Sequence, residues 1–353
     1  MTERERRVAL MSVAQALAET ERFDWLNDLI ADPRFGLKVA PGILKSTRIL
    51  HRFENIGRDF WRTLVRSMVR AGLADEAWSG AHEVQEPESR AGALASLTGA
   101  LALSMDERTD EAHADAEEAA KSIQGEHGRE EALLFLGEEL VRAGRFKAAE
   151  SVASDMRENR ERIVLLCSLV TALTRAGRLA EAKEIVFSAR NDNSQDNQDD
   201  LLYALVLELN RKGHHTEAWE MARGIKSEKR RVDALGKLAA ALSHAGDQQS
   251  HAVFSEAEEI AHAIRDVRHR ADAQNHLAAA LVQSGRFHDA LTRLGPQPID
   301  AFAQTLADWS DYFEMVKPGL FLQILREVTD VSGWVYPNWR KYHSFIREKF
   351  DGV

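Results

Sequence analysis

Short turns recur at nearly regular intervals along most of this 353-residue chain. Six of seven turn positions are glycine, and each of these glycines ends a phrase such as RAG, RKG or QSG. The turn positions are Gly72, Met105, Gly144, Gly177, Gly213, Gly246 and Gly285, separated by 33, 39, 33, 36, 33 and 39 residues. This period indicates one repeated supersecondary unit, and glycine fits the left-handed residue that ends a helix.

Apolar residues keep a helical spacing on both sides of these turns. Leucine stands four and eight residues before the turn in six units, and alanine stands five residues after it in five units. No proline lies between residues 88 and 295, as expected of uninterrupted helices. The pattern therefore predicts antiparallel helix pairs, each with an apolar face that only a neighbouring pair can cover.

One unit carries the whole skeleton L-[small]-x2-L-x3-G-x-[apolar]-x2-A, at Leu136, Gly137, Leu140, Gly144, Phe146 and Ala149. The skeleton resembles the tetratricopeptide repeat (TPR) family, and the match covers most of residues 57–294. The family's tryptophan and tyrosine in the first helix are replaced by leucine, and its proline near the end of the second helix is absent. The resemblance implies an all-α, right-handed superhelical solenoid of about seven or eight stacked helix-turn-helix hairpins.

The sequence divides into four regions. Residues 1–31 are expected to form a divergent first hairpin, because the phrase ERF at Glu21–Phe23 parallels GRF at Gly144–Phe146; a secretory signal is the alternative. Residues 32–56 lose the spacing and are interpreted as an irregular insertion, before TPR-like repeats at 57–295. Residues 296–353 are rich in aromatic side chains and are expected to form C-terminal capping helices, with a docking platform as the alternative.

Composition and motifs weigh against several function classes. The formal net charge is −10, which disfavours general binding to nucleic acid. The single cysteine, Cys167, excludes a disulfide framework within the chain, and no apolar run reaches the length of a membrane span. No phosphate-binding glycine loop, nucleophile elbow or paired-histidine metal motif is present. We therefore expect no catalytic residues, no cofactor and no metal.

Acidic residues recur thirteen residues before the turn, at Glu131, Asp200, Asp233 and Asp272. They lie in the first turn of the first helix, where acids ordinarily stabilise the helix. The TPR resemblance also implies that this position borders a concave groove, as do Tyr203 and Asn275. The groove positions hold no lysine of the kind that clamps a terminal carboxylate. Because residues 73–295 carry a net charge of −12, we expect basic or neutral peptides to be preferred there.

Arginine forms two patterns. Arg58, Arg62, Arg66 and Arg70 lie on one helical face, in a first 72 residues whose net charge is +4. This face is either solvated or a site for an acidic partner. A second set opposes the dipole at the start of the first helices, at Arg90, Arg129, Arg162, Arg231 and Arg270. This ladder either pairs with carboxylates or helix carbonyls of the preceding unit, or binds an anionic ligand.

The sequence predicts a cytoplasmic, non-catalytic scaffold or sensing arm that binds a protein or peptide on its concave surface. The physical basis is preorganisation, because stacked helices hold a binding surface that needs no ordering. The alternatives are an RNA-binding helical repeat that uses the arginine ladder and, less favoured, an uncharacterised enzyme.

Overall fold

A computed structural model describes residues 58–157, 160–188, 195–286 and 289–290, with short pieces between residues 307 and 326. The expected first hairpin, the insertion and most of the aromatic cap lie outside the described residues. All regular structure in the described part is helical, which confirms the all-α prediction there. The chain forms two compact units, residues 1–201 and 202–353.

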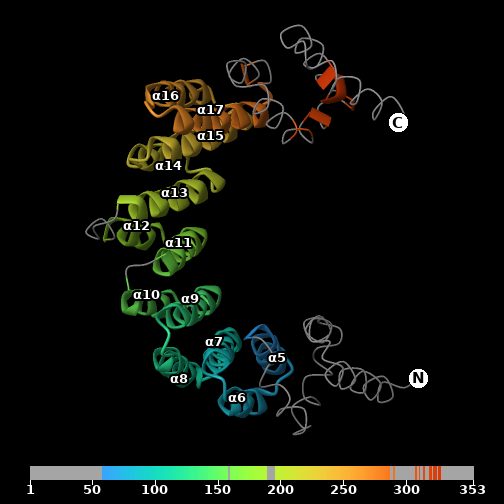
Figure 1. The fold of residues 1–353 in the computed structure, drawn as a ribbon, viewed down its shortest axis with the longest axis vertical. Coiled ribbons are helices and arrows are strands. Elements are labelled where there is room, and N and C mark those ends of the chain that lie inside the picture. Colours follow the sequence, from blue (N-terminus) through green and yellow to red (C-terminus); the bar gives the residue numbers. More distant parts are fainter. Residues whose placement is uncertain are drawn as a thin grey trace. The chain divides into compact units, whose positions relative to one another are not determined.

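The first unit contains successive helix pairs (Figure 1). Its helices are α5 (Arg58–Arg70), α6 (Ala74–Glu83), α7 (Pro87–Ser104), α8 (Thr109–Ser122), α9 (Glu126–Arg142), α10 (Phe146–Asp155), α11 (Arg160–Arg175) and α12 (Leu179–Ser188). Helix α7 packs against its partner α8 and also against α5 and α9. Helix α9 likewise packs against α10 and α11. Helices α5, α7 and α9 thus each contact their own partner and the first helix of the next pair.

The second unit repeats this packing. Helix α13 (Gln195–Arg211) contains the boundary between the units, and it is followed by α14 (His215–Arg223), α15 (Glu228–His244), α16 (Gln249–Ala263) and α17 (Val267–Gln283). Helix α15 packs against α14, α16 and α17. We call α5, α7, α9, α11, α13, α15 and α17 the first helices and the even-numbered helices the second helices.

Each of the seven expected turn residues has a left-handed backbone. The six glycines have φ between 71° and 79°, and Met105 has φ 57°. At the end of α9, the amide of Gly144 donates to the carbonyl of Val141 and the amide of Arg145 to that of Leu140. These bonds satisfy carbonyl groups that the end of a helix leaves without partners. Met105 is 91% exposed, so its side chain stabilises the turn little.

The expected apolar stripe forms the core of each unit. The leucines four and eight residues before the turn are at most 2% exposed: Leu97, Leu101, Leu136, Leu140, Leu169, Leu173, Leu205, Leu209, Leu238, Leu242, Leu277 and Leu281. The alanines five residues after the turn are fully buried, at Ala77, Ala149, Ala182, Ala218 and Ala290. Within the described stretches, no helix is both long and apolar enough to cross a membrane.

Candidate functional site

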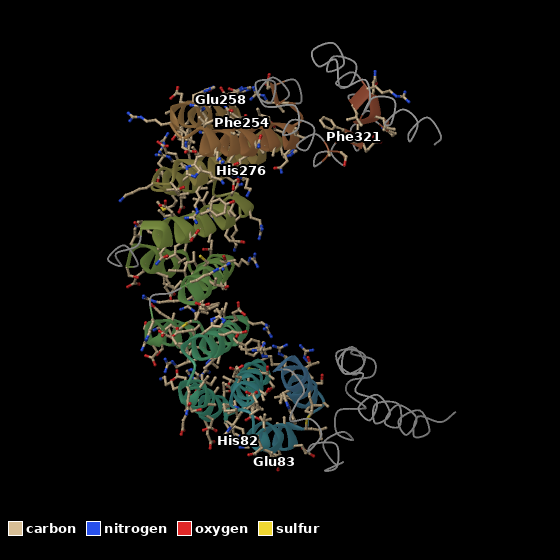
Figure 2. All side chains as sticks on the ribbon, viewed as in Figure 1. His82, Glu83, Phe254, Glu258, His276 and Phe321 are labelled. Carbon is tan, nitrogen blue, oxygen red and sulfur yellow. The ribbon has the colours of Figure 1, made fainter. Side chains whose placement is uncertain are left out.

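Four polar side chains meet on three successive first helices of the second unit. The Tyr203 hydroxyl on α13 donates a hydrogen bond to Oδ2 of Asp233 on α15. Lys237, also on α15, donates from Nζ to the Tyr203 oxygen at 2.5 Å and to Asp233 Oδ2 at 3.0 Å. Nδ1 of His276 on α17, labelled in Figure 2, lies 3.3 Å from Asp233 Oδ1. We call these four residues the Tyr203 cluster.

Repeat spacing explains why these residues meet. Asp233 and Lys237 are four residues apart, so they lie one turn apart on the same face of α15. Lys237 and His276 each stand nine residues before their turns, and Tyr203 stands ten before its own. Because α15 and α17 pack against each other, side chains at equivalent positions of neighbouring helix pairs can reach one another. The cluster is therefore built from the same part of the repeat in three consecutive helix pairs.

The Asp233 carboxylate is the centre of the cluster. Burial alone would raise the pKa of Asp233, but hydrogen bonds from His276, Tyr203 and Lys237 outweigh it and lower the pKa to about 2. Burial and the bond to Asp233 raise the pKa of the Tyr203 phenol. Burial opposes the charged Lys237, yet its hydrogen bonds to Tyr203 and Asp233 raise the lysine pKa. At neutral pH the cluster therefore holds a carboxylate, an ammonium group and a neutral phenol.

The outer edge of the cluster is accessible. The Asp233 side chain is 14% exposed, whereas those of Lys237 and His276 are 41% and 42% exposed. Among the described residues, the third N–H of Lys237 and Nε2 of His276 have no hydrogen-bond partner. The cluster can therefore form hydrogen bonds with a ligand, while Asp233 stays engaged within the protein. A phenol with a raised pKa is a hydrogen-bond donor, not a nucleophile ready at neutral pH.

The acidic residues that recur thirteen residues before the turns, which we call the acidic row, are distributed between the two units. Asp272 forms an ion pair with Lys229 at 2.7 Å, so it and Asp233 each contact a lysine of the second unit. Glu131 and Asp200 are half-buried in the first unit, and Asn275 is half-buried in the second. The structure thus joins Tyr203 with Asp233 but does not gather the predicted residues into one site. Internal pairing of Asp233 and Asp272 also reduces the negative charge that they offer a basic peptide.

The arginine face of α5 is only partly solvated. Arg70 is exposed, Arg62 and Arg66 are half-buried, and the Arg58 side chain lies outside the described residues. The Arg62 guanidinium lies 3.6 Å from the ring centroid of Phe135 on α9, and Arg66 donates from Nη2 to Oε1 of Glu139. These two arginines therefore extend across α7 to reach α9, which differs from a simple solvated face.

Glu139 receives a second arginine from its own helix. Arg142 donates from Nη1 to Glu139 Oε2 at 2.9 Å, and the Glu139 side chain is 1% exposed. The side chains of Arg66 and Arg142 are 26% and 48% exposed. We call Arg66, Glu139 and Arg142 the Glu139 cluster. A buried carboxylate thus holds two guanidinium groups that both reach the surface.

Glycine on α7 makes room for this crossing. A Cβ atom at Gly99 would lie 2.5 Å from Oε2 of Glu139, and one at Gly92 would lie 2.9 Å from Nε of Arg62. Both separations are shorter than a van der Waals contact. The absence of a side chain at these two positions therefore lets groups from α5 and α9 approach the backbone of α7.

One rung of the arginine ladder has a partner from the preceding helix. Arg270 donates from Nη1 to the carbonyl of Ile264, the C-cap residue of α16, at 3.2 Å. This bond satisfies a carbonyl at a helix end, as expected from the structural interpretation of the ladder. Arg90 is exposed, and Arg129, Arg162 and Arg231 are half-buried. Among the described residues, no three His, Cys, Asp or Glu side chains are placed to share a metal ion.

Sequence reasoning did not identify Lys237, His276, Glu139 or Arg142 as site residues. Lys237 and His276 stand at the same position of two successive repeats, nine residues before the turn, and this shared polar position is a signal in the sequence. Glu138 and Glu139 together interrupt the apolar stretch from Ala132 to Val141, which marks this pair but does not single out Glu139. Neither signal names a partner on another helix, because the contacts between helices join residues 30 to 73 positions apart.

Comparison with known proteins gives no family. No family model matches the sequence, and no curated protein matches it. Similar solved structures include Ton1535 from Thermococcus onnurineus NA1, which is 14% identical, with 82% of this chain and 97% of that chain covered and a TM-score of 0.33. Another is a circular tandem repeat protein with a novel repeat topology, 15% identical over 93% and 84% of the chains, with a TM-score of 0.22. Scores this low carry no argument about function.

Proposed function

We propose that this chain is a non-catalytic scaffold or sensing arm that binds a protein or peptide on its first helices. The TPR-like repeat pattern supports this function, because stacked hairpins of that kind form a right-handed solenoid of about seven or eight units whose first helices line a groove. Such a surface binds an extended segment without first having to order itself.

The observation that carries the proposal is the exposed edge of the Tyr203 cluster. Polar side chains from three successive first helices converge there, and Lys237 and His276 keep unused hydrogen-bonding groups. Asp233, which accepts a hydrogen bond from Tyr203, holds the Lys237 and His276 side chains in position. The raised pKa of Tyr203 also favours recognition over acid–base catalysis.

Site-specific photo-crosslinking tests this function. A photoreactive amino acid at position 276 on α17 is compared with one at Ser255, an exposed residue of the second helix α16. After illumination in extract from the native source, mass spectrometry should find a discrete peptide crosslinked at position 276 and none at position 255. Recombinant partner should then bind wild-type protein about tenfold more tightly than Lys237→Met, as expected for one lost charged hydrogen bond.

Two results would reject the proposal. Equal crosslinking at positions 255 and 276 would mean that the first-helix surface has no preference for a partner. Crosslinks to RNA alone at position 276 would instead support the RNA-binding alternative.

A further inference from the structure

The Glu139 cluster of the first unit carries an inference that rests on the proposed function and deepens it. We propose that Arg66 and Arg142 together bind an acidic side chain of a peptide partner, so that the first unit recognises an acidic segment. The expectation of a basic ligand came from the negative charge of the acidic row, whereas the Glu139 cluster has two arginines for one glutamate and is positive.

The two guanidinium groups have hydrogen-bonding capacity left over. Each arginine has five N–H donors, and Glu139 takes one from Arg66 and one from Arg142. Nε of Arg66 is buried with no partner among the described residues, so the donors that Arg66 can offer a ligand are on its Nη atoms. Guanidinium groups bind carboxylates through paired, parallel hydrogen bonds, and two arginines at one point suit the two oxygens of a carboxylate.

The site is preorganised before any ligand arrives. Glu139 is buried and contacts both arginines through its two different oxygens, which fixes the guanidinium groups beside each other. Gly99 leaves the space that Glu139 occupies over α7. Holding flexible arginine side chains in place reduces the entropy that a ligand would otherwise have to remove on binding. Phe135 lies next to the cluster, with the Arg62 guanidinium over its ring at 3.6 Å and the Arg66 guanidinium 5.8 Å from its ring centroid, so both arginines rest against one aromatic side chain.

Local charge favours an acidic ligand of limited size. Arg62, Arg66, Arg70 and Arg142 outnumber Glu138 and Glu139 on this part of α5 and α9. Burial raises the pKa of Glu138, because it disfavours the charged form of that carboxyl group. The surrounding residues 73–295 carry a net charge of −12, which repels a long polyanion. A peptide with a few carboxylates fits this arrangement better than a nucleic acid does.

Fluorescence anisotropy with defined peptides tests the site in the full chain. The probe is a labelled ten-residue peptide that alternates glutamate and serine, and the control probe carries glutamine in place of glutamate. Wild-type protein should bind the glutamate peptide, with affinity falling as salt rises, and should bind the glutamine peptide at least tenfold more weakly. Arg142→Gln should weaken binding of the glutamate peptide about tenfold, the effect of one lost charge-assisted hydrogen bond.

Three variants separate this site from general charge. Arg178→Gln makes the same charge change in the same unit, at an arginine paired with Glu181 three residues on, and should leave binding unchanged. Arg142→Lys should bind the glutamate peptide more tightly than Arg142→Gln but less tightly than wild type, because lysine lacks the paired donors. The double variant Arg66→Gln/Glu139→Gln leaves no unpaired buried carboxylate and should also lose binding. Circular dichroism verifies that each variant is folded.

Several outcomes would overturn the inference. One is that Arg142→Gln and Arg178→Gln weaken binding of the glutamate peptide equally. Another is that wild-type protein binds the glutamate and glutamine peptides equally well. A third is that a ten-nucleotide oligouridylate binds more tightly than the glutamate peptide and needs Arg142 to do so. If the glutamate peptide does not bind while crosslinks form at position 276, this inference is wrong and the proposed function stands. If neither occurs, the peptide-binding function is itself rejected.

Discussion

Replacing Asp233 with asparagine should destabilise the protein at neutral pH and should do so less as the pH falls. Asp233 has a folded-state pKa of about 2, against an ordinary value of 3.8. At about 1.36 kcal/mol for each pH unit, this difference corresponds to about 2 kcal/mol of stability. Its side chain is 14% exposed, so screening by solvent is limited. Because the pKa is depressed, this stability is fully present above pH 3.8 and is lost as pH falls through about 2.

Urea denaturation followed by circular dichroism measures the effect. We expect Asp233→Asn to lower the free energy of unfolding by about 2 kcal/mol at pH 7, and the gap to wild type to shrink steadily between pH 4 and pH 2. Asp272→Asn is the matched control, since it removes a carboxylate from the equivalent position of the next helix pair. The Asp272 side chain is 48% exposed and pairs with Lys229, so its loss should cost less than about 1 kcal/mol.

A constant difference between wild type and Asp233→Asn from pH 7 to pH 2 would refute this reasoning. It would mean that the hydrogen bonds of the carboxylate do not favour its charged form. Equal destabilisation by the two variants would refute it as well, because the loss of the more buried carboxylate should have the larger effect.

Three further substitutions test packing, and urea denaturation checks each. Leu136→Ala should lower the free energy of unfolding by about 2–5 kcal/mol, because Leu136 is 1% exposed; a loss below about 1 kcal/mol would argue against a tightly packed stripe. Met105→Gly should raise it by about 0.5–1 kcal/mol by relieving a left-handed φ of 57°, and no gain would show that the turn is unstrained. Gly99→Ala should lower it by about 1–3 kcal/mol, since the new Cβ would lie 2.5 Å from Glu139 Oε2; a neutral result would show that Glu139 moves freely.

The two clusters suggest different roles for polar residues on the first helices. In the Tyr203 cluster, a carboxylate is surrounded by a phenol, an ammonium group and an imidazole, and the half-exposed groups are the Lys237 ammonium and the His276 ring. In the Glu139 cluster, a buried carboxylate holds two arginines at the surface. Both arrangements place acidic residues beneath basic ones. Counting charges along the sequence therefore misjudges the charge that a partner would meet.

Local features of the chain were predictable because they depend on neighbours in sequence. A leucine four and eight residues before each turn marks one face of a helix, and all twelve of these leucines are buried. The seven turn residues have left-handed backbone angles, including Met105, which only its alignment with the glycines could identify. Tyr203 and Asp233 were named as partner-binding candidates, but their direct hydrogen bond was not foreseen.

The sequence by itself determined the helical hairpins, their turns and their buried stripes, because helix periodicity and backbone sterics act over a few residues. Only the tertiary structure decided which charged groups meet. Arg66 reaches Glu139 over the intervening helix α7, and His276 on α17 reaches Asp233 on α15. These contacts depend on how far each helix is rotated and shifted against the next, and on glycines that open space between them. That register is set by packing of the whole unit, so no local pattern specifies it.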